Sequence, residues 1–259
     1  MPKTNDCNFN PKSNIHNQTS MSIVIFITIL ITATIQSIFG VGVLLFGTPI
    51  LLLFGFDFIT ILTILLPISL IINSFQLVVS YKEIDFVFYK NMLLYTVPFI
   101  VLFLFFVTST KLNINPYVGC FLVLIALQRQ FPSIDKQIKK MMKFESIYLA
   151  FMGLIHGITN LGGSLLTAII LNKKLSKDKS RATIAICYLT FALFQIITLY
   201  FLIDKLDINF FDYTIYWLLG AGIFILIEKQ LFKKIDDQKY SISFRIFLLG
   251  SGLLLIAKS

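Results

Sequence analysis

Long apolar runs separated by short polar segments make up most of the chain after residue 20. The runs cover residues 22–54, 58–80, 91–107, 112–128, 146–171, 182–203, 212–227 and 242–257. The uninterrupted runs are about as long as the roughly 20 residues that a helix needs to span a bilayer. Phe and β-branched residues fill them without the alternation that is typical of a barrel strand. The pattern therefore predicts an all-α polytopic membrane protein.

Two of the runs, 22–54 and 146–171, are interrupted in the middle by glycine and polar residues, at 40–42 and at 159–163. Inside a bilayer an unpaired backbone amide costs several kcal/mol, so irregular backbone is tolerated only where it is buried in protein or lines a watery cavity. A matched pair of interruptions in the two halves of a membrane protein is typical of a transport site. For a single glycine, close helix packing is the simpler interpretation.

The same order of segments occurs twice, because each interrupted run is followed by three uninterrupted ones. An offset of 120 residues, shortened by one after the interruption, aligns residues of similar kind: Gln36 with His156, Gly40 with Asn160, Gly42 with Gly162, and Gln76 with Gln195. Weak identity with matched segment lengths is what an old internal duplication leaves. We therefore expect two membrane repeats.

The expected boundaries follow from this duplication. The first repeat covers 21–128 and the second covers 146–259, with a basic cytoplasmic linker at 129–145 between them. Residues 1–20 are polar and are expected to form a disordered tail. The run that follows lacks a basic leader and continues into more apolar sequence, which favours a retained membrane segment over a cleaved signal peptide.

The distribution of Lys and Arg bears on how the interrupted runs meet the membrane. If both cross it, the 22 Lys and Arg divide evenly between the two sides. If both are re-entrant, entering and leaving on the same side, most of these residues fall on one side, in 129–143, 173–181 and 229–239. Short cytoplasmic loops are enriched in Lys and Arg, so the re-entrant arrangement is favoured. Residues 22–40 are long enough to span, which leaves the first run open.

With two re-entrant segments, each repeat is a broken helix pair plus three transmembrane helices. Three crossings are an odd number, so the second repeat is inverted relative to the first and both termini lie outside. Inverted repeats bring their broken helices together near the middle of the membrane and provide a route to alternating access.

Composition narrows the function. Hydrophobic residues make up 57% of the chain and charged residues 14%. The net charge of +9 lies in short loops that face anionic lipid, which argues against nucleic-acid binding. The three cysteines form no Cys-x-x-Cys pair, so neither a zinc site nor a disulfide framework is suggested. No metal and no cofactor are expected. No nucleophile with a base and no P-loop is evident, so we expect neither an enzyme nor an ATP-driven pump.

Several of these residues resemble a known family. Gly40-x-Gly42 followed by Pro49, Gly162-Gly163-Ser164, the run from Ser180 to Thr183, and Leu66-Pro67 with Asn73 to Gln76 are similar to motifs of the TauE/SafE family of membrane transporters. The resemblance covers nearly the whole chain after residue 20. It implies a multi-pass protein of the bacterial inner membrane that moves small sulfur-containing anions such as sulfite or sulfonates. Val43 and Leu44 stand where the family usually has small residues, and Asn160 stands where it usually has glycine.

An anion site needs hydrogen-bond donors more than charges. A helix that begins at an interruption presents unpaired N–H groups and the positive end of its dipole, and glycines let a ligand approach that backbone. The predicted substrate-binding residues are Gln36, Gly40, Gly42, Asn73, Gln76, His156, Thr159, Asn160, Gly162, Gly163, Ser164 and Gln195. The tighter half of the site is expected at 160–164.

Alternatives remain open for some of these residues and for the function. Asn73, Gln76 and Gln195 serve equally well as substrate contacts or as interhelical hydrogen bonds. His156 aligns with a neutral Gln36, which favours a neutral interhelical imidazole over a proton carrier. A structural or regulatory membrane subunit without transport activity is the alternative function. The expected partners are a small anion and the lipid bilayer, and self-association into a homo-oligomer is left open.

Overall fold

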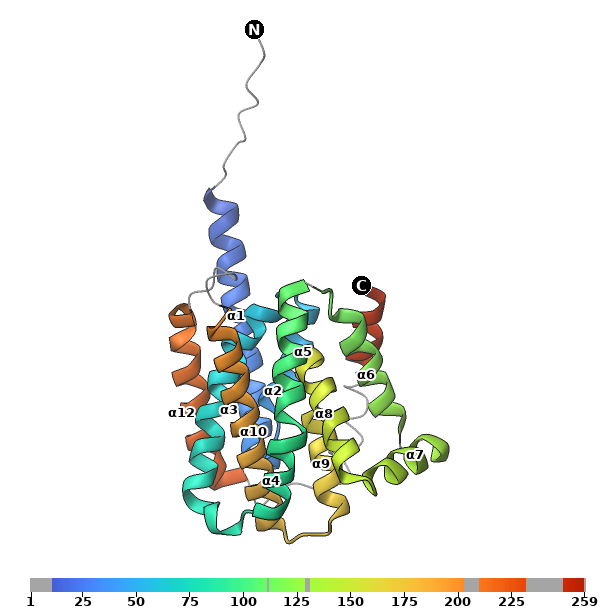
Figure 1. The fold of residues 1–259 in the computed structure, drawn as a ribbon. Coiled ribbons are helices and arrows are strands. Elements are labelled where there is room, and N and C mark those ends of the chain that lie inside the picture. The colour runs from blue at the N-terminus through green and yellow to red at the C-terminus, as the bar shows by residue number, and fades with distance from the viewer. Residues whose placement is uncertain (1–10, 111, 129–130, 203–209, 232–248, 259) are drawn as a thin grey trace.

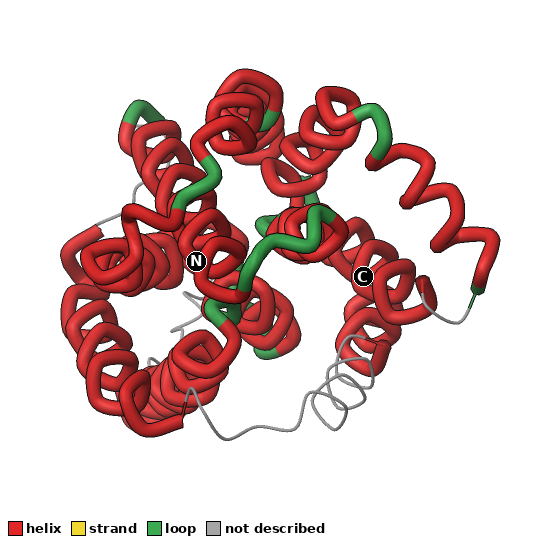
Figure 2. Tube along the Cα trace, turned by 90° about the horizontal axis from the view of Figure 1, so that it is seen from below, coloured by secondary structure: helices red, strands yellow, loops and turns green. Residues whose placement is uncertain are grey.

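The structure, a computed structural model, describes residues 11–110, 112–128, 131–202, 210–231 and 249–258. This part of the chain is helical throughout, with short connections and no strand. The helices lie nearly alongside one another in a bundle (Figure 1), and the end-on view of Figure 2 looks along most of their axes. The expectation of an all-α protein is confirmed for the described residues.

The helical elements follow the apolar runs. They are α1 (Pro11–Phe39), α2 (Val43–Leu53), α3 (Phe58–Ser80), η1 (Tyr81–Glu83), α4 (Phe86–Tyr95), α5 (Val97–Thr110), α6 (Asn115–Gln128), α7 (Pro132–Met142), α8 (Glu145–Thr159), α9 (Gly163–Asn172), α10 (Lys177–Tyr200), η2 (Phe210–Tyr213) and α12 (Thr214–Leu231). A last helix covers Leu249–Lys258.

Four helical stretches of the described chain are long and apolar enough to cross a membrane: Ser20–Ser37, Phe58–Glu83, Phe86–Thr110 and Lys177–Tyr200. Five further apolar helices are shorter: Val43–Leu53, Asn115–Gln128, Gly163–Asn172, Thr214–Glu228 and Leu249–Lys258. Many large apolar side chains point outward, among them Val79, Phe106 and Leu226, which are 89%, 53% and 72% exposed. Lipid is the solvent that such a surface fits.

Three expected boundaries differ in the structure. Residues 11–20, placed in the disordered tail, form the first turns of α1, while residues 1–10 lie outside the described part. Proline fits the first position of a helix because its missing N–H has no intrahelical partner there. The linker at 129–145 contains a helix, α7, whose Ile138, Met141 and Met142 pack against the core while Lys139 and Lys140 are exposed.

The third difference concerns the run at 91–107, which in the structure begins earlier. Its helix starts at Phe86, because the Asp85 side chain accepts a hydrogen bond from the Phe88 N–H and so caps α4. The helix is interrupted at Thr96, two residues before Pro98. Proline lacks the N–H that would continue the hydrogen-bond ladder, which accounts for the interruption.

Close packing of helices without large side chains between them joins the two halves of the chain. A Cβ on Gly153 would collide with the carbonyl oxygen of Thr96, and one on Gly157 would lie 2.8 Å from the carbonyl oxygen of Ile100. Glycines spaced by four therefore let α8 lie directly against α5, as small residues do in membrane helix pairs. The Thr96 hydroxyl also donates to the Leu149 carbonyl at 3.0 Å.

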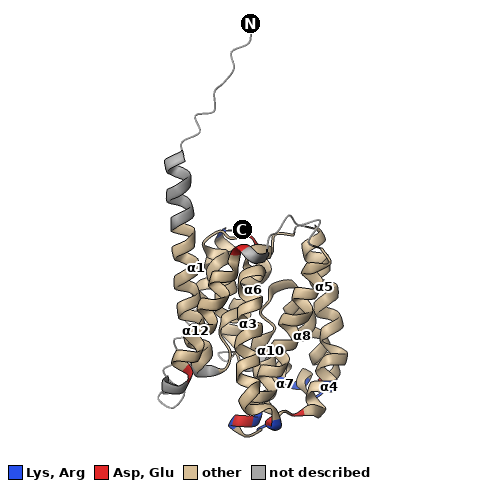
Figure 3. Cartoon of the chain, turned by 90° about the vertical axis from the view of Figure 1, so that its left-hand side faces the viewer, with Lys and Arg blue, Asp and Glu red and all other residues tan. Residues whose placement is uncertain are grey.

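The described ends of the chain and the basic residues lie at opposite ends of the bundle. The start of α1 and the helix Leu249–Lys258 are at the upper end of Figure 1, and the Lys258 ammonium there donates to the Leu53 carbonyl at 2.8 Å. Figure 3 shows the Lys and Arg of the described residues mainly at the lower end, near α4, α7 and the start of α10. Part of the third basic segment, 229–239, lies outside the described residues.

Candidate functional site

Both interrupted runs end their first helix in the same way. Gly40 follows α1 with φ of 74°, and its N–H donates to the Gln36 carbonyl at 2.8 Å. Asn160 follows α8 with φ of 61°, and its N–H donates to the His156 carbonyl at 2.8 Å. Left-handed backbone is adopted readily by glycine and, among other residues, most easily by Asn. This conformation suits both Gly40 and Asn160, the residues that the two halves place at this position.

The second helix of each run begins directly after a glycine, although Gly42 is extended with φ of 173° and Gly162 is helical with φ of −57°. The Phe46 N–H bonds to the Gly42 carbonyl at 2.9 Å, and the Leu166 N–H bonds to the Gly162 carbonyl at 3.0 Å. A Cβ on either glycine would strike the preceding helix at the equivalent place. For Gly42 the nearest atoms belong to Gln36 and Thr32, and for Gly162 they belong to His156 and Met152. The aligned glycines Gly42 and Gly162 therefore pack on their preceding helices in a similar way.

The two breaks differ in which side chains bond the backbone N–H and C=O groups that the interrupted helices leave without intrahelical partners. In the first, the Gln36 side-chain oxygen accepts from the Val43 N–H at 2.9 Å. In the second, the Thr159 hydroxyl accepts from the Leu161 N–H at 3.2 Å, and the Ser164 hydroxyl donates to the Leu161 carbonyl at 3.0 Å. Thr159 also donates to the Ile155 carbonyl at 2.7 Å. The hydroxyls of Thr159 and Ser164, predicted as ligand donors, are thus engaged with the backbone in this conformation.

The second break contacts the helix that follows the first. The Asn160 amide nitrogen donates to the Thr48 hydroxyl at 3.0 Å, and the Asn160 oxygen accepts from Gln195 at 3.3 Å. The Gln195 oxygen lies 3.1 Å from His156 Nε2. All four side chains are buried. This chain of hydrogen bonds, which we call the Asn160 cluster, joins α2, α8 and α10 and contains the predicted residues His156, Asn160 and Gln195.

His156 sits in a largely apolar setting within this cluster. Its ring centroid lies 4.7 Å from that of Phe191, and the side chain is completely buried. Its Nδ1 has no hydrogen-bond partner among the described residues, so one ring nitrogen remains available. A ligand group or a water molecule in hydrogen-bond reach would satisfy it.

Asn73 and Gln76 are buried on α3 but are not bonded to the Asn160 cluster. The Asn73 amide nitrogen donates to the Ser69 carbonyl at 2.6 Å and lies 3.1 Å from its hydroxyl. The Asn73 oxygen and both polar atoms of Gln76 have no partner among the described residues. Gln76 therefore differs from its aligned mate Gln195, which is bonded on both sides. Buried polar groups without partners mark a place for a ligand or water.

Gly163 leaves room for a tyrosine that the sequence pattern did not single out. A Cβ on Gly163 would overlap the hydroxyl of Tyr188, which is buried on α10. Thr48 was missed as well, because a threonine in an apolar helix usually bonds only its own backbone. Neither residue stands out by spacing, and only their contacts with the second break identify them.

A third residue missed as a site residue is Arg181, which was assigned to a basic loop. Its side chain instead extends to the first break, where a Cβ on Gly40 would lie 3.4 Å from its Cγ. Its Nη2 donates to Glu228 of α12 at 2.7 Å. Its position as the last basic residue before an apolar run was the available signal, since long cationic side chains extend along apolar surface.

The interior carries no full charge elsewhere in the described part. The polar side chains that are buried there are Thr, Ser, Asn, Gln and His, and none is Asp, Glu, Lys or Arg. No group of three or more His, Cys, Asp or Glu in the described ranges has a metal-binding arrangement. An interior of this kind offers dipoles and hydrogen bonds rather than ionic ligands.

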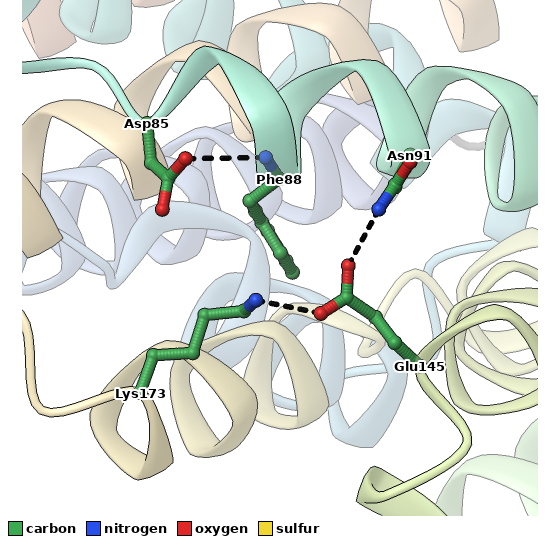
Figure 4. A network of polar contacts seen from close by, with 5 residues as sticks. All are labelled: Asp85, Phe88, Asn91, Glu145 and Lys173. Atoms are coloured by element: carbon green, nitrogen blue, oxygen red, sulfur yellow. Dashed lines mark hydrogen bonds and ion pairs between the residues drawn. The ribbon is translucent and has the colours of Figure 1, made fainter.

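An ion pair joins the two outer ends of the second interrupted run (Figure 4). The Glu145 carboxylate, at the first residue of α8, accepts from Lys173, directly after α9, at 2.6 Å. Its other oxygen accepts from the Asn91 amide of α4 at 2.9 Å. The Lys173 ammonium also lies 5.0 Å from the centroid of the Phe88 ring. The beginning and the end of this run are therefore close to each other.

Comparison with known proteins identifies the chain. A family model described as sulfite exporter TauE/SafE matches residues 25–255, which is nearly the whole chain. No curated protein matches, and no solved structure matches. With its apolar helices, this match establishes a membrane protein of a transporter family. The chain belongs to the sulfite exporter TauE/SafE family.

Proposed function

We propose that this protein is a secondary transporter that moves a small sulfur-containing anion, such as sulfite or a sulfonate, across the bacterial inner membrane. The anion binds between the two helix breaks, near the middle of the membrane. The observation that carries the proposal is the equivalence of the breaks: each has a left-handed residue, a glycine packed on the preceding helix, and a new helix start. Broken helices of this kind occur where irregular backbone lines a transport site.

The binding residues we propose are those predicted from the sequence together with Thr48 and Tyr188. The helix starts at Val43 and Gly163 direct the positive ends of their dipoles toward the site. The Asn160 cluster supplies neutral amide, imidazole and hydroxyl groups. Neutral donors bind an anion weakly enough to release it, which transport requires. No metal or cofactor enters this proposal.

The same proposal includes the inverted repeat and the re-entrant segments. The Glu145–Lys173 pair supports a hairpin for the second interrupted run, since it joins the two ends of that run. The lower-end gathering of Lys and Arg supports a cytoplasmic position for that end, in line with the positive-inside rule. The first interrupted run includes a stretch, Ser20–Ser37, that is long enough to span by itself.

Flux in proteoliposomes tests the proposal. Purified protein should accelerate movement of sulfite, sulfoacetate or another sulfonate above protein-free vesicles, and excess unlabelled anion should compete. A variant that replaces Asn160 by Ala serves as a matched protein control with reduced flux. If none of these anions moves faster than in protein-free vesicles, the transport proposal for this substrate class is wrong and a structural or regulatory role takes its place. Crosslinking of the same vesicles tests for a homo-oligomer.

A further inference from the structure

An arginine and a glutamate meet beside the first helix break. Arg181 lies near the start of α10 and Glu228 lies near the end of α12, so their ion pair connects two helices that approach the end of α1. Gly40, at that end, is buried and left-handed. A Cβ on Gly40 would lie 3.4 Å from Cγ and 3.8 Å from Nε of Arg181. No side chain therefore separates the arginine from the backbone of the break.

We propose that Arg181 contacts the transported anion at the first break, and that Glu228 occupies its guanidinium group until the anion replaces the carboxylate. This inference rests on the proposed transport function and specifies one contact of its site. Arginine presents a planar set of N–H donors that matches two oxygens of an oxyanion. A sulfite or sulfonate group and the Glu228 carboxylate therefore compete for the same donors.

Exchange of one oxyanion for another avoids the cost of leaving a partly buried charge unpaired. The side chains of Arg181 and Glu228 are 19% and 30% exposed, so both charges are partly withdrawn from water. Removing one partner from such a pair leaves the other with an uncompensated charge. If the anion enters as the carboxylate leaves, the arginine stays paired throughout, and Glu228 retains enough exposure to be solvated on the side away from the break.

The pair joins two helices that both pack on α3. α12 is held to α3 through the Trp217 indole, which donates to the Thr63 carbonyl at 3.2 Å. α10 is also held near its start by the Thr183 hydroxyl, which accepts from the Asp85 N–H at 2.9 Å. Release of the Arg181–Glu228 pair by an anion therefore removes one contact between α10 and α12 and leaves the packing of both helices on α3 in place.

The test uses the full chain and four variants: Arg181→Gln, Glu228→Gln, the charge exchange Arg181→Glu with Glu228→Arg, and the control Lys179→Gln. Lys179 is a basic residue two positions from Arg181 on the same helix, and its side chain is partly exposed. The first measurement is stabilisation of the purified protein against heating by added sulfite or methanesulfonate. The second is KM and maximal rate of flux in proteoliposomes.

The expected results differ among the variants. Arg181→Gln should weaken the apparent affinity for both probes by about tenfold or more, since a charge-assisted hydrogen bond is lost. Glu228→Gln should bind both probes more tightly than the wild type, because the competing carboxylate is gone. The charge exchange should stay folded yet fail to bind, since a carboxylate then lies beside Gly40. Lys179→Gln should behave as the wild type.

Several results would overturn the inference. If the charge exchange restores wild-type affinity, the pair is only a structural tie. If Glu228→Gln binds less tightly, the carboxylate does not compete. Absence of stabilisation of the wild type by either probe also rejects the contact. If the probes stabilise the protein but no flux is measured, the Arg181 contact stands and the transport function is wrong. If Arg181→Gln transports with an unchanged KM, the transport function stands and the Arg181 contact is wrong.

Discussion

Asn160 carries three structural tasks at once. Its backbone takes the left-handed conformation that ends α8, its amide nitrogen bonds to Thr48, and its oxygen bonds to Gln195. The aligned Gly40 performs only the first of these, because it has no side chain. Both breaks therefore end their first helix with a left-handed residue, and of these two aligned residues only Asn160 also bonds through its side chain to the other half of the protein.

Two substitutions of Asn160 separate the backbone from the side chain. Asn160→Gly keeps the left-handed conformation and loses two hydrogen bonds, which should destabilise the fold by about 1–3 kcal/mol. Asn160→Ala loses the same bonds and adds about 1–2 kcal/mol of backbone strain. Asn160→Ala should thus be less stable than Asn160→Gly, although Ala usually stabilises a helix more than Gly does. Thermal unfolding in detergent measures this, and equal stability of the two would show that the positive φ is not required.

At the scale of the elements, glycines let the helices of each interrupted run pack closely against their neighbours. Gly42 and Gly162 pack on the helix that precedes them, and Gly153 and Gly157 bring α8 against α5. The outer ends of α8 and α9 are joined by Glu145 and Lys173. Small residues at the turn between α8 and α9, and an ion pair between their outer ends, together favour a hairpin that enters and leaves the membrane on one side.

Labelling at the outer ends of α8 and α9 tests whether these two helices form a hairpin. Single cysteines replacing Phe144 and Asn172, both exposed, should react with a membrane-impermeant thiol reagent added to the same side. The background protein has Cys7, Cys120 and Cys187 replaced by Ser. A cysteine replacing Asn113, at the far end of the bundle, serves as the control and should react from the opposite side. Reaction of positions 144 and 172 from opposite sides would show that the segment crosses the membrane.

At the scale of the whole molecule, basic residues and chain ends separate to opposite ends of the bundle. The described Lys and Arg lie mainly at the end that holds α7 and the start of α10, while Lys258 lies at the other. Cytoplasmic loops of membrane proteins carry the excess of Lys and Arg. The orientation that we propose on this ground has α7 and the α9–α10 connection in the cytoplasm, and the start of α1 and the helix Leu249–Lys258 toward the outside.

Accessibility in intact cells tests this orientation. Cysteines that replace Lys140 and Lys177 should be protected from an impermeant reagent until the cells are opened, whereas one that replaces Asn113 should react at once. All three positions are exposed, so differences in reaction report the side rather than burial. Immediate reaction at 140 or 177 would reverse the orientation, and with it the cytoplasmic position of the Arg181–Glu228 pair.

The helical fold class, the spans near 58–80, 91–107 and 182–203, and the two breaks could be read from the sequence. Apolar run length and the positions of glycine carry that information directly, because bilayer thickness sets the length of a helix and backbone conformation restricts the residue type. The earlier start of the helix at Phe86 and the presence of α7 could not be read in this way. A capping residue such as Asp85 and an amphipathic surface helix do not produce long apolar runs in the sequence.

The partners within the site were decided by tertiary structure. The sequence by itself determined that polar residues such as Asn160, His156 and Gln195 are buried, since they lie inside apolar runs. Only the fold decided that Asn160 contacts Thr48, that Tyr188 fills the space at Gly163, and that Arg181, near the start of α10, extends to Gly40. The physical reason is that these contacts join helices far apart in the chain, and the spacing of residues along one helix does not record which side chain of another helix will face it.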